Sequence, residues 1–209
     1  MHDVQFFYYL AQTRGLPAFQ AASCGNIAGA PPGRDGIDHL TGALNALPAI
    51  PTFFSKLECI LIVADNDGNP TAALQRVQQY IDATIDIQPG RRYIAPAAEQ
   101  LSAGANPSIT ILMLPWTGMP GALDSLCLAA ARNREPGIAA CVDNFERCIN
   151  PQGWEPQKIA KMKLRAHISA AYSDPYISPA WVWRDNTDLV PLNDPVFNQI
   201  EGFLRAFLT

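Results

Sequence analysis

The stretch CILIVADNDGNP, residues 59–70, contains an unbroken apolar run that ends at two aspartates, Asp65 and Asp67. A short run rich in Ile and Val is typical of a strand buried on both faces, which predicts a parallel sheet covered by helices. In such sheets, ligands bind beyond the carboxyl ends of the strands. The two acids therefore stand where a binding site is expected.

The spacing of Asp65 and Asp67 favours a cation site. Side chains two residues apart in an extended chain point the same way, so both carboxylates are expected to face one small space. Two such anions repel each other unless a cation or a proton joins them, and Mg²⁺ or Mn²⁺ prefers oxygen ligands of this kind. A second interpretation remains open, because Asp, Asn and Gly are also common turn residues that simply end a strand.

Strand and helix patterns alternate along the first 132 residues and then give way to helices alone. The run SITILMLP, residues 108–115, predicts a second buried strand, and shorter strands are expected at 18–23 and 92–95. The expected helices, of which the third could also be a turn, are 3–14, 37–47, 51–56, 70–84, 121–132, 137–149, 156–172 and 194–208. This order predicts an α/β domain over residues 1–132, with a mostly helical C-terminal extension over 133–209 packed on it.

Composition narrows the class of protein. The chain has 209 residues, of which 48% are hydrophobic and 16% charged, and its net charge of −4 argues against general affinity for nucleic acid. A local basic groove is still compatible with that charge. No apolar stretch approaches the roughly 20 residues that span a bilayer, so no membrane partner is expected. The five cysteines include no Cys-x-x-Cys pair, which argues against zinc or disulfides and predicts a reducing cytoplasm.

Three residues in the second half of the chain are candidates for the same site. Asp124 lies about one turn into the helix that follows strand 108–115, and parallel topology would place it at the same sheet edge as Asp65, as a third metal ligand. An acid in a first helical turn is equally well explained by the helix dipole. Lys161 and Lys163, within QKIAKMKLRAH at 157–167, are candidates for contacting a substrate phosphate. A solvated helix face is the alternative for both lysines.

The tryptophans are a further set of aromatic candidates, because such rings can stack on nucleic-acid bases. They are Trp116, Trp154, Trp181 and Trp183. We expect them instead to anchor the C-terminal helices, where their large apolar rings can be buried.

Two other acidic motifs fit the segment less well. The D-x-D-G core of haloacid-dehalogenase phosphatases also follows a buried strand, and its first Asp is a nucleophile. That family has Thr after the Gly, where this chain has Asn69, and a later acidic pair that the downstream sequence does not clearly supply. An EF-hand loop fails because its twelfth position would be Arg76 instead of Glu. A phosphatase of the first type remains a weaker alternative.

Three stretches of the chain match one known family more closely. Asp65-Asn66-Asp67 matches a D-x-D motif, GMPGALDSLCL at 118–128 matches G-x-L-E/D-x-L-x-L, and the last stretch, 194–204, matches a family ending. In these motifs the chain resembles the topoisomerase–primase (Toprim) domains, above all a stand-alone group related to the nuclease half of OLD (overcoming lysogenization defect) proteins. The resemblance spans nearly the whole chain. It implies a Rossmann-like parallel sheet flanked by helices and Mg²⁺-dependent cleavage of phosphodiester bonds, or phosphoryl transfer, on nucleic acid.

The first Toprim motif, E-G-x-x-D, is only partly present. Asp3-Val4 fits its end, which would place the Glu and Gly, and the strand before them, upstream of Met1. The first predicted helix, 3–14, is apolar on nearly every side and is expected to be well buried, like the helix of a βα unit that lacks its strand. We therefore expect a truncated chain or a start site placed too late. The resemblance implies that this Glu acts as general acid–base or metal ligand.

The partial motif leaves two hypotheses of different classes. In the first, the chain is a metal-dependent nuclease or phosphoryl-transfer enzyme in which Asp65 and Asp67 hold the ion, with reduced or no activity in the absence of the motif Glu. In the second, it is a non-catalytic module on a Toprim-like scaffold that binds nucleotide, nucleic acid or a protein partner.

Overall fold

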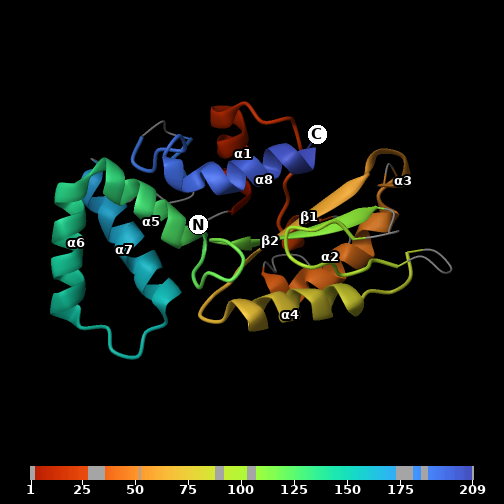
Figure 1. Ribbon diagram of the computed structural model, residues 1–209, viewed down its shortest axis with the longest axis horizontal. Helices are drawn as coiled ribbons and strands as arrows, with labels where there is room; N and C mark the ends of the chain where they lie inside the picture. The colour runs from red at the N-terminus through yellow and green to blue at the C-terminus, as the bar shows by residue number, and fades with distance from the viewer. Residues whose placement is uncertain are drawn as a thin grey trace. The chain divides into compact units, whose positions relative to one another are not determined.

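A computed structural model describes residues 3–27, 36–51, 53–87, 92–102, 107–172, 181–184 and 188–208, apart from the side chains of residues 54 and 55. The chain divides into two compact units (Figure 1). We call Ala22–Pro120 the strand unit, and Met1–Ala21 together with Gly121–Thr209 the helical unit. The α/β class is confirmed. The division between these units differs from the predicted domain boundary at residue 132, which stays a prediction.

The strand unit contains the predicted parallel pair. β1 (Cys59–Asp65) and β2 (Ser108–Leu114) form a sheet that has two strands in the described part of the chain. Their register pairs Cys59 with Ser108 and Asp65 with Leu114, so both strands end at one edge, which we call the carboxyl edge. Six of the seven β2 residues are buried, as expected for an apolar run covered on both faces. In β1 only Ile62 is buried and the other residues are half-buried, so the prediction of a strand buried on both faces is wrong for β1.

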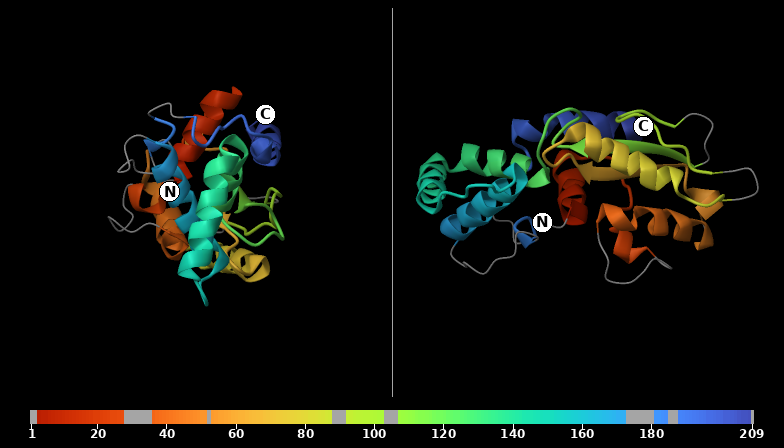
Figure 2. Two further views of the ribbon diagram at one scale, coloured as in Figure 1. Left: turned by 90° about the vertical axis from the view of Figure 1, so that its left-hand side faces the viewer. Right: turned by 90° about the horizontal axis from the view of Figure 1, so that it is seen from below.

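Helix α4 (Pro70–Asp82) follows β1 directly and confirms the predicted helix at this position. The Asn69 side chain caps it by accepting a hydrogen bond from the Ala72 amide N–H (3.1 Å), and Pro70 occupies its first turn, where no amide hydrogen is needed. The helix packs on β1 and on α2 (Leu40–Ala46), as the right-hand view of Figure 2 shows.

The core of the strand unit lies between the sheet and these helices. Helix α2 is flanked by short 3-10 helices, Ile37–His39 and Leu47–Ala49, and α3 (Phe53–Lys56) follows, so the helices expected at 37–47 and 51–56 are present. The buried residues of this core are Leu40, Leu44, Phe53, Ile62, Ala73, Val77, Ile81, Tyr93, Ile109, Ile111 and Met113.

The two shorter strands expected from the sequence are not formed. Residues 18–23 are irregular and mostly exposed, so they supply no buried face for a sheet. Residues 92–95 are also irregular, and pairing with β2 begins only at Ala98, which bridges Ile111 in parallel. The Glu99 amide N–H donates to the Ile111 carbonyl (2.8 Å), while the Ser102 side chain accepts from the Ile109 amide (2.8 Å). A serine side chain thus replaces part of a regular ladder.

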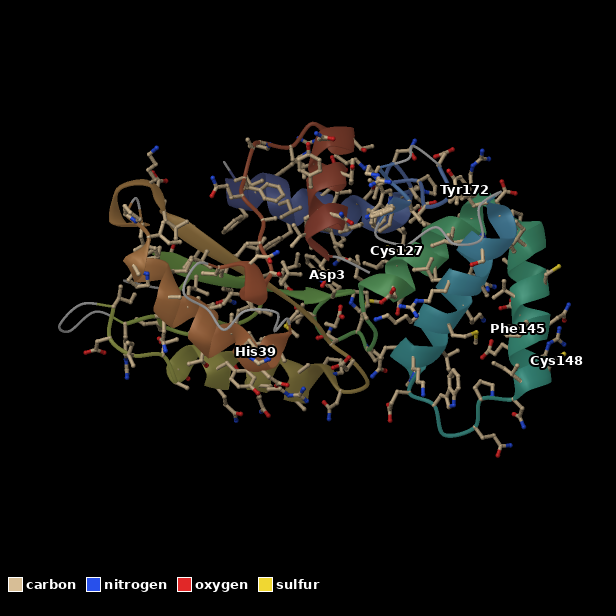
Figure 3. The ribbon with its side chains drawn as sticks, turned by 180° about the vertical axis from the view of Figure 1, so that it is seen from behind. Asp3, His39, Cys127, Phe145, Cys148 and Tyr172 are labelled. Carbon is tan, nitrogen blue, oxygen red and sulfur yellow. The ribbon has the colours of Figure 1, made fainter. Side chains whose placement is uncertain are left out.

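The helical unit contains the helices predicted for the second half of the chain. They are α5 (Leu123–Arg134), α6 (Pro136–Ile149), α7 (Pro156–Ala171) and, after a 3-10 turn at Pro195–Phe197, α8 (Asn198–Leu208). Helices α5, α6 and α7 pack on one another, and Cys127 of α5 is fully buried (Figure 3). Within the described residues, no helix combines the length and the apolar character needed to cross a membrane.

Helix α1 (Asp3–Arg14) also belongs to the helical unit and has the predicted bounds. It is not buried all round: Phe6, Phe7 and Leu10 are covered, whereas Tyr8 is 53% exposed. Phe6 packs against Phe197, with ring centroids 5.3 Å apart. The apolar pattern of α1 therefore predicted more burial than the structure shows.

Arg14 joins the end of α1 to the C-terminal part of the chain. Its guanidinium donates to the carbonyls of Leu192 (2.7 Å) and Asp194 (2.8 Å) and to the carboxylate of Glu201 (2.6 Å). Only 14% of the Arg14 side chain is exposed, so these are largely dehydrated contacts. A buried guanidinium is stable only with such partners, which makes Arg14 a fixed link between the two ends of this unit.

Candidate functional site

The two predicted acids lie at the carboxyl edge of the sheet. Asp65 is the last residue of β1, and Asp67 follows after one intervening residue; both are half-buried. Asp67 has φ of +50°, in the left-handed region that Asp and Asn adopt more readily than most residues. The chain is therefore no longer extended at Asp67. Strand alternation therefore does not orient the Asp65 and Asp67 side chains in the same direction, and this part of the prediction is wrong.

Asn66, between the two acids, is fully buried and clamps the carboxyl edge. Its amide N–H donates to the Leu114 carbonyl (2.8 Å), which extends the register by one residue. Its side-chain Nδ2 donates to the carbonyls of Trp116 (2.7 Å) and Met119 (2.8 Å), in the loop after β2. Asn66 therefore ties together the loops that follow both strands. Sequence reasoning treated it as a spacer, although a polar residue directly after a buried strand was a signal.

The donor atoms at this edge suit a hard cation. Asp65 and Asp67 offer carboxylate oxygens, and the buried Oδ1 of Asn66 has no hydrogen-bond partner in the described structure. No group of three or more His, Cys, Asp or Glu side chains placed to hold a metal occurs among the described residues. Mg²⁺ commonly uses only one or two carboxylates and keeps several waters or phosphate oxygens. The residues therefore fit an ion shared with a ligand better than an ion enclosed by protein.

A further acid, Glu99, reaches the loop after β2. Its carboxylate accepts a hydrogen bond from the Thr117 hydroxyl, and its own backbone has φ of +55°. Sequence reasoning missed Glu99, because residues 92–102 show no clear period and their pairing with β2 follows only from the three-dimensional structure. Glu99 therefore adds negative charge to a loop at the carboxyl edge.

Asp124 and Lys161 meet inside the helical unit. Asp124 lies in the first turn of α5, and its Oδ2 is 4.0 Å from Lys161 Nζ of α7. The Asp124 side chain is 13% exposed and that of Lys161 is 46% exposed. Because Asp124 belongs to the helical unit, its predicted role as a third ligand beside Asp65 stays a prediction.

Lys163 is held in a network that connects α5, α6 and α7. Its Nζ donates to Asp143 Oδ1 (2.5 Å) and Glu146 Oε2 (2.8 Å), and Arg132 donates to both oxygens of Asp143 (2.7 and 2.8 Å). Hydrogen bonds from Arg132 and Lys163 hold the pKa of Asp143 well below its ordinary value. Lys163 thus has a structural role in this unit, and its predicted contact with a phosphate stays a prediction.

The tryptophans of the helical unit divide into one anchor and two exposed rings. Trp183 is an anchor, but of the N-terminal helix and not of the C-terminal helices as predicted: its ring packs on Phe6 of α1, and its Nε1 donates to the Val190 carbonyl (2.9 Å). Trp154 and Trp181 are 38% and 45% exposed, and the anchoring prediction is wrong for them. Each carries a cation over its ring instead: Lys158 at 4.2 Å and Arg184 at 3.9 Å from the respective centroid.

Comparison with known proteins identified no relative of this chain. Searches against protein-family models, curated proteins and solved structures found no match to the chain. The resemblance to Toprim domains therefore rests on the sequence motifs, and the role of each residue rests on its own geometry.

Proposed function

We propose that this chain is a Toprim-type protein that binds Mg²⁺ or Mn²⁺ at Asp65 and Asp67 and acts on phosphodiester or phosphoryl groups of nucleic acid. The observation that carries the proposal is the position of both acids beside buried Asn66, at the carboxyl edge of a parallel sheet. This edge is where ligands bind in parallel α/β sheets.

The residues around the acids support a preorganised site. The β1–β2 register fixes Asp65 opposite Leu114, and Asn66 holds both strand-end loops in one arrangement. A backbone held in this way keeps both acids at the carboxyl edge before a cation binds, which lowers the entropic cost of binding. A bound divalent ion would orient the phosphate and stabilise the charge that develops on its oxygens.

A second candidate function is binding without catalysis. It is favoured by the donor set, because the described residues supply no third His, Cys, Asp or Glu side chain placed with Asp65 and Asp67 to hold a metal. It is also favoured by Lys163, whose ammonium group is engaged by Asp143 and Glu146. A module of this kind would hold a metal–phosphate ligand at the carboxyl edge and leave the covalent bonds intact.

Metal titration tests the site shared by both candidates. By calorimetry, we expect the Asp65→Asn, Asp67→Asn double variant to bind Mg²⁺ and Mn²⁺ about tenfold more weakly or not at all, because two carboxylates supply the charge that attracts the ion. Asp82→Asn, an exposed acid at the end of α4, is the matched control and should bind like the unaltered chain. Equal affinity in the double variant would contradict the site.

Cleavage assays separate the two candidates. Labelled single- and double-stranded DNA and RNA are incubated with the chain and Mn²⁺ or Mg²⁺, and cleavage that disappears in the double variant supports the enzyme. Metal binding at Asp65 and Asp67 without cleavage of any substrate supports the binding module. Release of phosphate from small phosphomonoesters alone would instead indicate a phosphatase of the haloacid-dehalogenase type.

A further inference from the structure

One face of α7 carries a row of cations that ends at an exposed aromatic ring. The row, which we call the α7 basic face, consists of Trp154, Lys158, Lys161 and Arg165, all of them exposed. Lys158, Lys161 and Arg165 are three and four residues apart, which places them along a single side of α7, with successive positions about 5–6 Å apart. Trp154 precedes the helix and joins this side through Lys158, whose Nζ lies 4.2 Å from the centroid of its ring. The charges therefore form a line and not a cluster.

The cations of this face are poorly neutralised by the protein. The other paired cations of the helical unit have carboxylate partners within 3.2 Å: Arg14 with Glu201, Arg132 and Lys163 with Asp143, Arg134 with Asp188, and Arg205 with Glu201. In the described structure, Lys158 and Arg165 have no carboxylate partner, and Lys161 has only Asp124, at 4.0 Å. In a chain of net charge −4, this row of cations is a local exception that fits a negatively charged partner.

We propose that the α7 basic face binds a single strand of nucleic acid. A row of cations suits the regular charges of a phosphate backbone, and the exposed ring of Trp154 offers a surface on which a base can stack. Lys158 Nζ lies 4.2 Å from the centroid of that ring and covers one of its faces, so a base would stack on the opposite face. An acidic protein segment would use the same charges, but it would leave the aromatic ring without a ligand. The ring therefore favours a single strand, whose bases are accessible, over a protein or a duplex.

This inference deepens the proposed function by naming the form of nucleic acid, and it is tested separately from the metal site. Fluorescence anisotropy with a labelled dodecathymidylate is measured in EDTA, so that Asp65 and Asp67 hold no ion. We expect the Lys158→Glu, Arg165→Glu double variant to bind about tenfold more weakly or worse in about 50 mM NaCl. The control, Arg76→Glu with Arg147→Glu, makes the same change of charge at two exposed arginines elsewhere and should bind within about twofold of the unaltered chain.

Salt and ring substitutions sharpen the test. Three phosphate contacts predict that the logarithm of affinity falls with the logarithm of salt concentration at a slope of about −2, and that the double variant retains a slope of about −0.7. Trp154→Ala should weaken binding about five- to tenfold, whereas Trp154→Phe, which keeps a stacking ring, should retain most of the affinity. Circular dichroism confirms that each variant keeps its helices.

Several outcomes would overturn the inference. They are absence of binding in EDTA, equal binding by the double variant and its control, equal competition by duplex DNA, or equal competition by polyglutamate. Each of these leaves the Mg²⁺ titration of Asp65 and Asp67 unaffected. Conversely, an Asp65→Asn, Asp67→Asn variant that retains full Mg²⁺ affinity but binds the oligonucleotide normally would contradict the proposed metal site and support the α7 basic face.

Discussion

The strand unit is stabilised mainly by buried apolar side chains, whereas the helical unit also depends on polar contacts between residues far apart in the sequence. In the strand unit, Ile109 and Ile111 of β2 are completely buried among residues of the helices around them. In the helical unit, Arg14 holds the last helical part of the chain, and Asp143 joins three helices. Apolar substitutions therefore test the stability of the strand unit. Substitutions of single charged groups and changes of pH test the stability of the helical unit.

The largest effect is expected in the core of the strand unit. Ile111→Ala removes a completely buried side chain and should lower the free energy of unfolding by about 3–4 kcal/mol, because a cavity remains where the side chain packed. Urea denaturation and hydrogen exchange of residues 59–65 and 108–114 measure the loss. Ile85→Ala, at a side chain that is 66% exposed, is the control and should change stability by no more than about 0.5 kcal/mol. Similar losses for both would contradict an apolar core at β2.

A smaller loss is expected when the charged network of the helical unit is broken. Asp143→Asn weakens the contacts with Arg132 and Lys163 and should cost about 1–2 kcal/mol, a reduced value because about a third of the side chain is exposed. The folded state lowers the pKa of Asp143 from 3.8, so this stabilisation is present above about pH 4 and is lost as the pH falls further.

Urea unfolding of the Asp143→Asn variant at several pH values, compared with the unaltered chain, measures this contribution. Asp188→Asn is the matched control, because the pair Arg134–Asp188 is exposed and should contribute little. Equal losses of stability in the two variants would mean that the network around Asp143 contributes no more than an exposed ion pair.

A pH dependence is expected from His167, which is fully buried in α7. Burial lowers its pKa below 6.5, and the positive charge of Arg132 adds to this, while Glu135, between α5 and α6, acts in the opposite direction. As the pH falls, His167 is therefore protonated at a higher pH in the unfolded chain than in the folded chain. Stability is complete above about pH 6.5 and falls below it, by at most about 1.4 kcal/mol per pH unit.

His167→Leu should remove this part of the pH dependence, which urea midpoints between pH 7.5 and 5.5 measure. His39→Leu removes an imidazole from the strand unit and serves as the control, with hydrogen exchange of α7 as the local measurement. An unchanged pH profile in His167→Leu would show that another group carries the dependence.

The smallest effect is expected at the cap of α4. Asn69→Ala removes the side-chain acceptor of the Ala72 amide and should cost about 1 kcal/mol, while Asn69→Asp keeps an acceptor and should cost less. Hydrogen exchange in the first turn of α4 resolves this change. A loss as large as that of Ile111→Ala would mean that local polar contacts stabilise the strand unit as strongly as its core.

Much of the fold was predictable from local sequence patterns. The apolar runs at β1 and β2, the cap and Pro70 of α4, and the helical periods after residue 121 each depend on neighbouring residues only. The strands expected at 18–23 and 92–95 failed because a strand needs a partner and a buried face, which a local pattern does not reveal. The place of α1 in the helical unit was not predictable for the same reason, since its partners lie more than 170 residues away.

The candidate site was predictable in its position but not in its geometry. The run before Asp65 and Asp67 correctly placed both acids at the carboxyl end of a strand in a parallel sheet. The clamp made by Asn66 depends on the loop after β2, which lies about 50 residues later, and the left-handed backbone at Asp67 follows from the structure alone. The pairing of Lys163 with Asp143 is likewise a contact between helices, so the sequence showed the charge of the lysine but not its partner.

The contacts of Arg14 also impose an order on events during synthesis. Glu201, which accepts a hydrogen bond from Arg14, leaves the ribosome 187 residues later. At about 5–20 residues per second, that interval lasts about 10–40 s, in which the strand unit is translated in full and α1 still lacks its C-terminal partners. Phe6, Phe7 and Leu10 are the surface that a nascent-chain chaperone would meet during this interval.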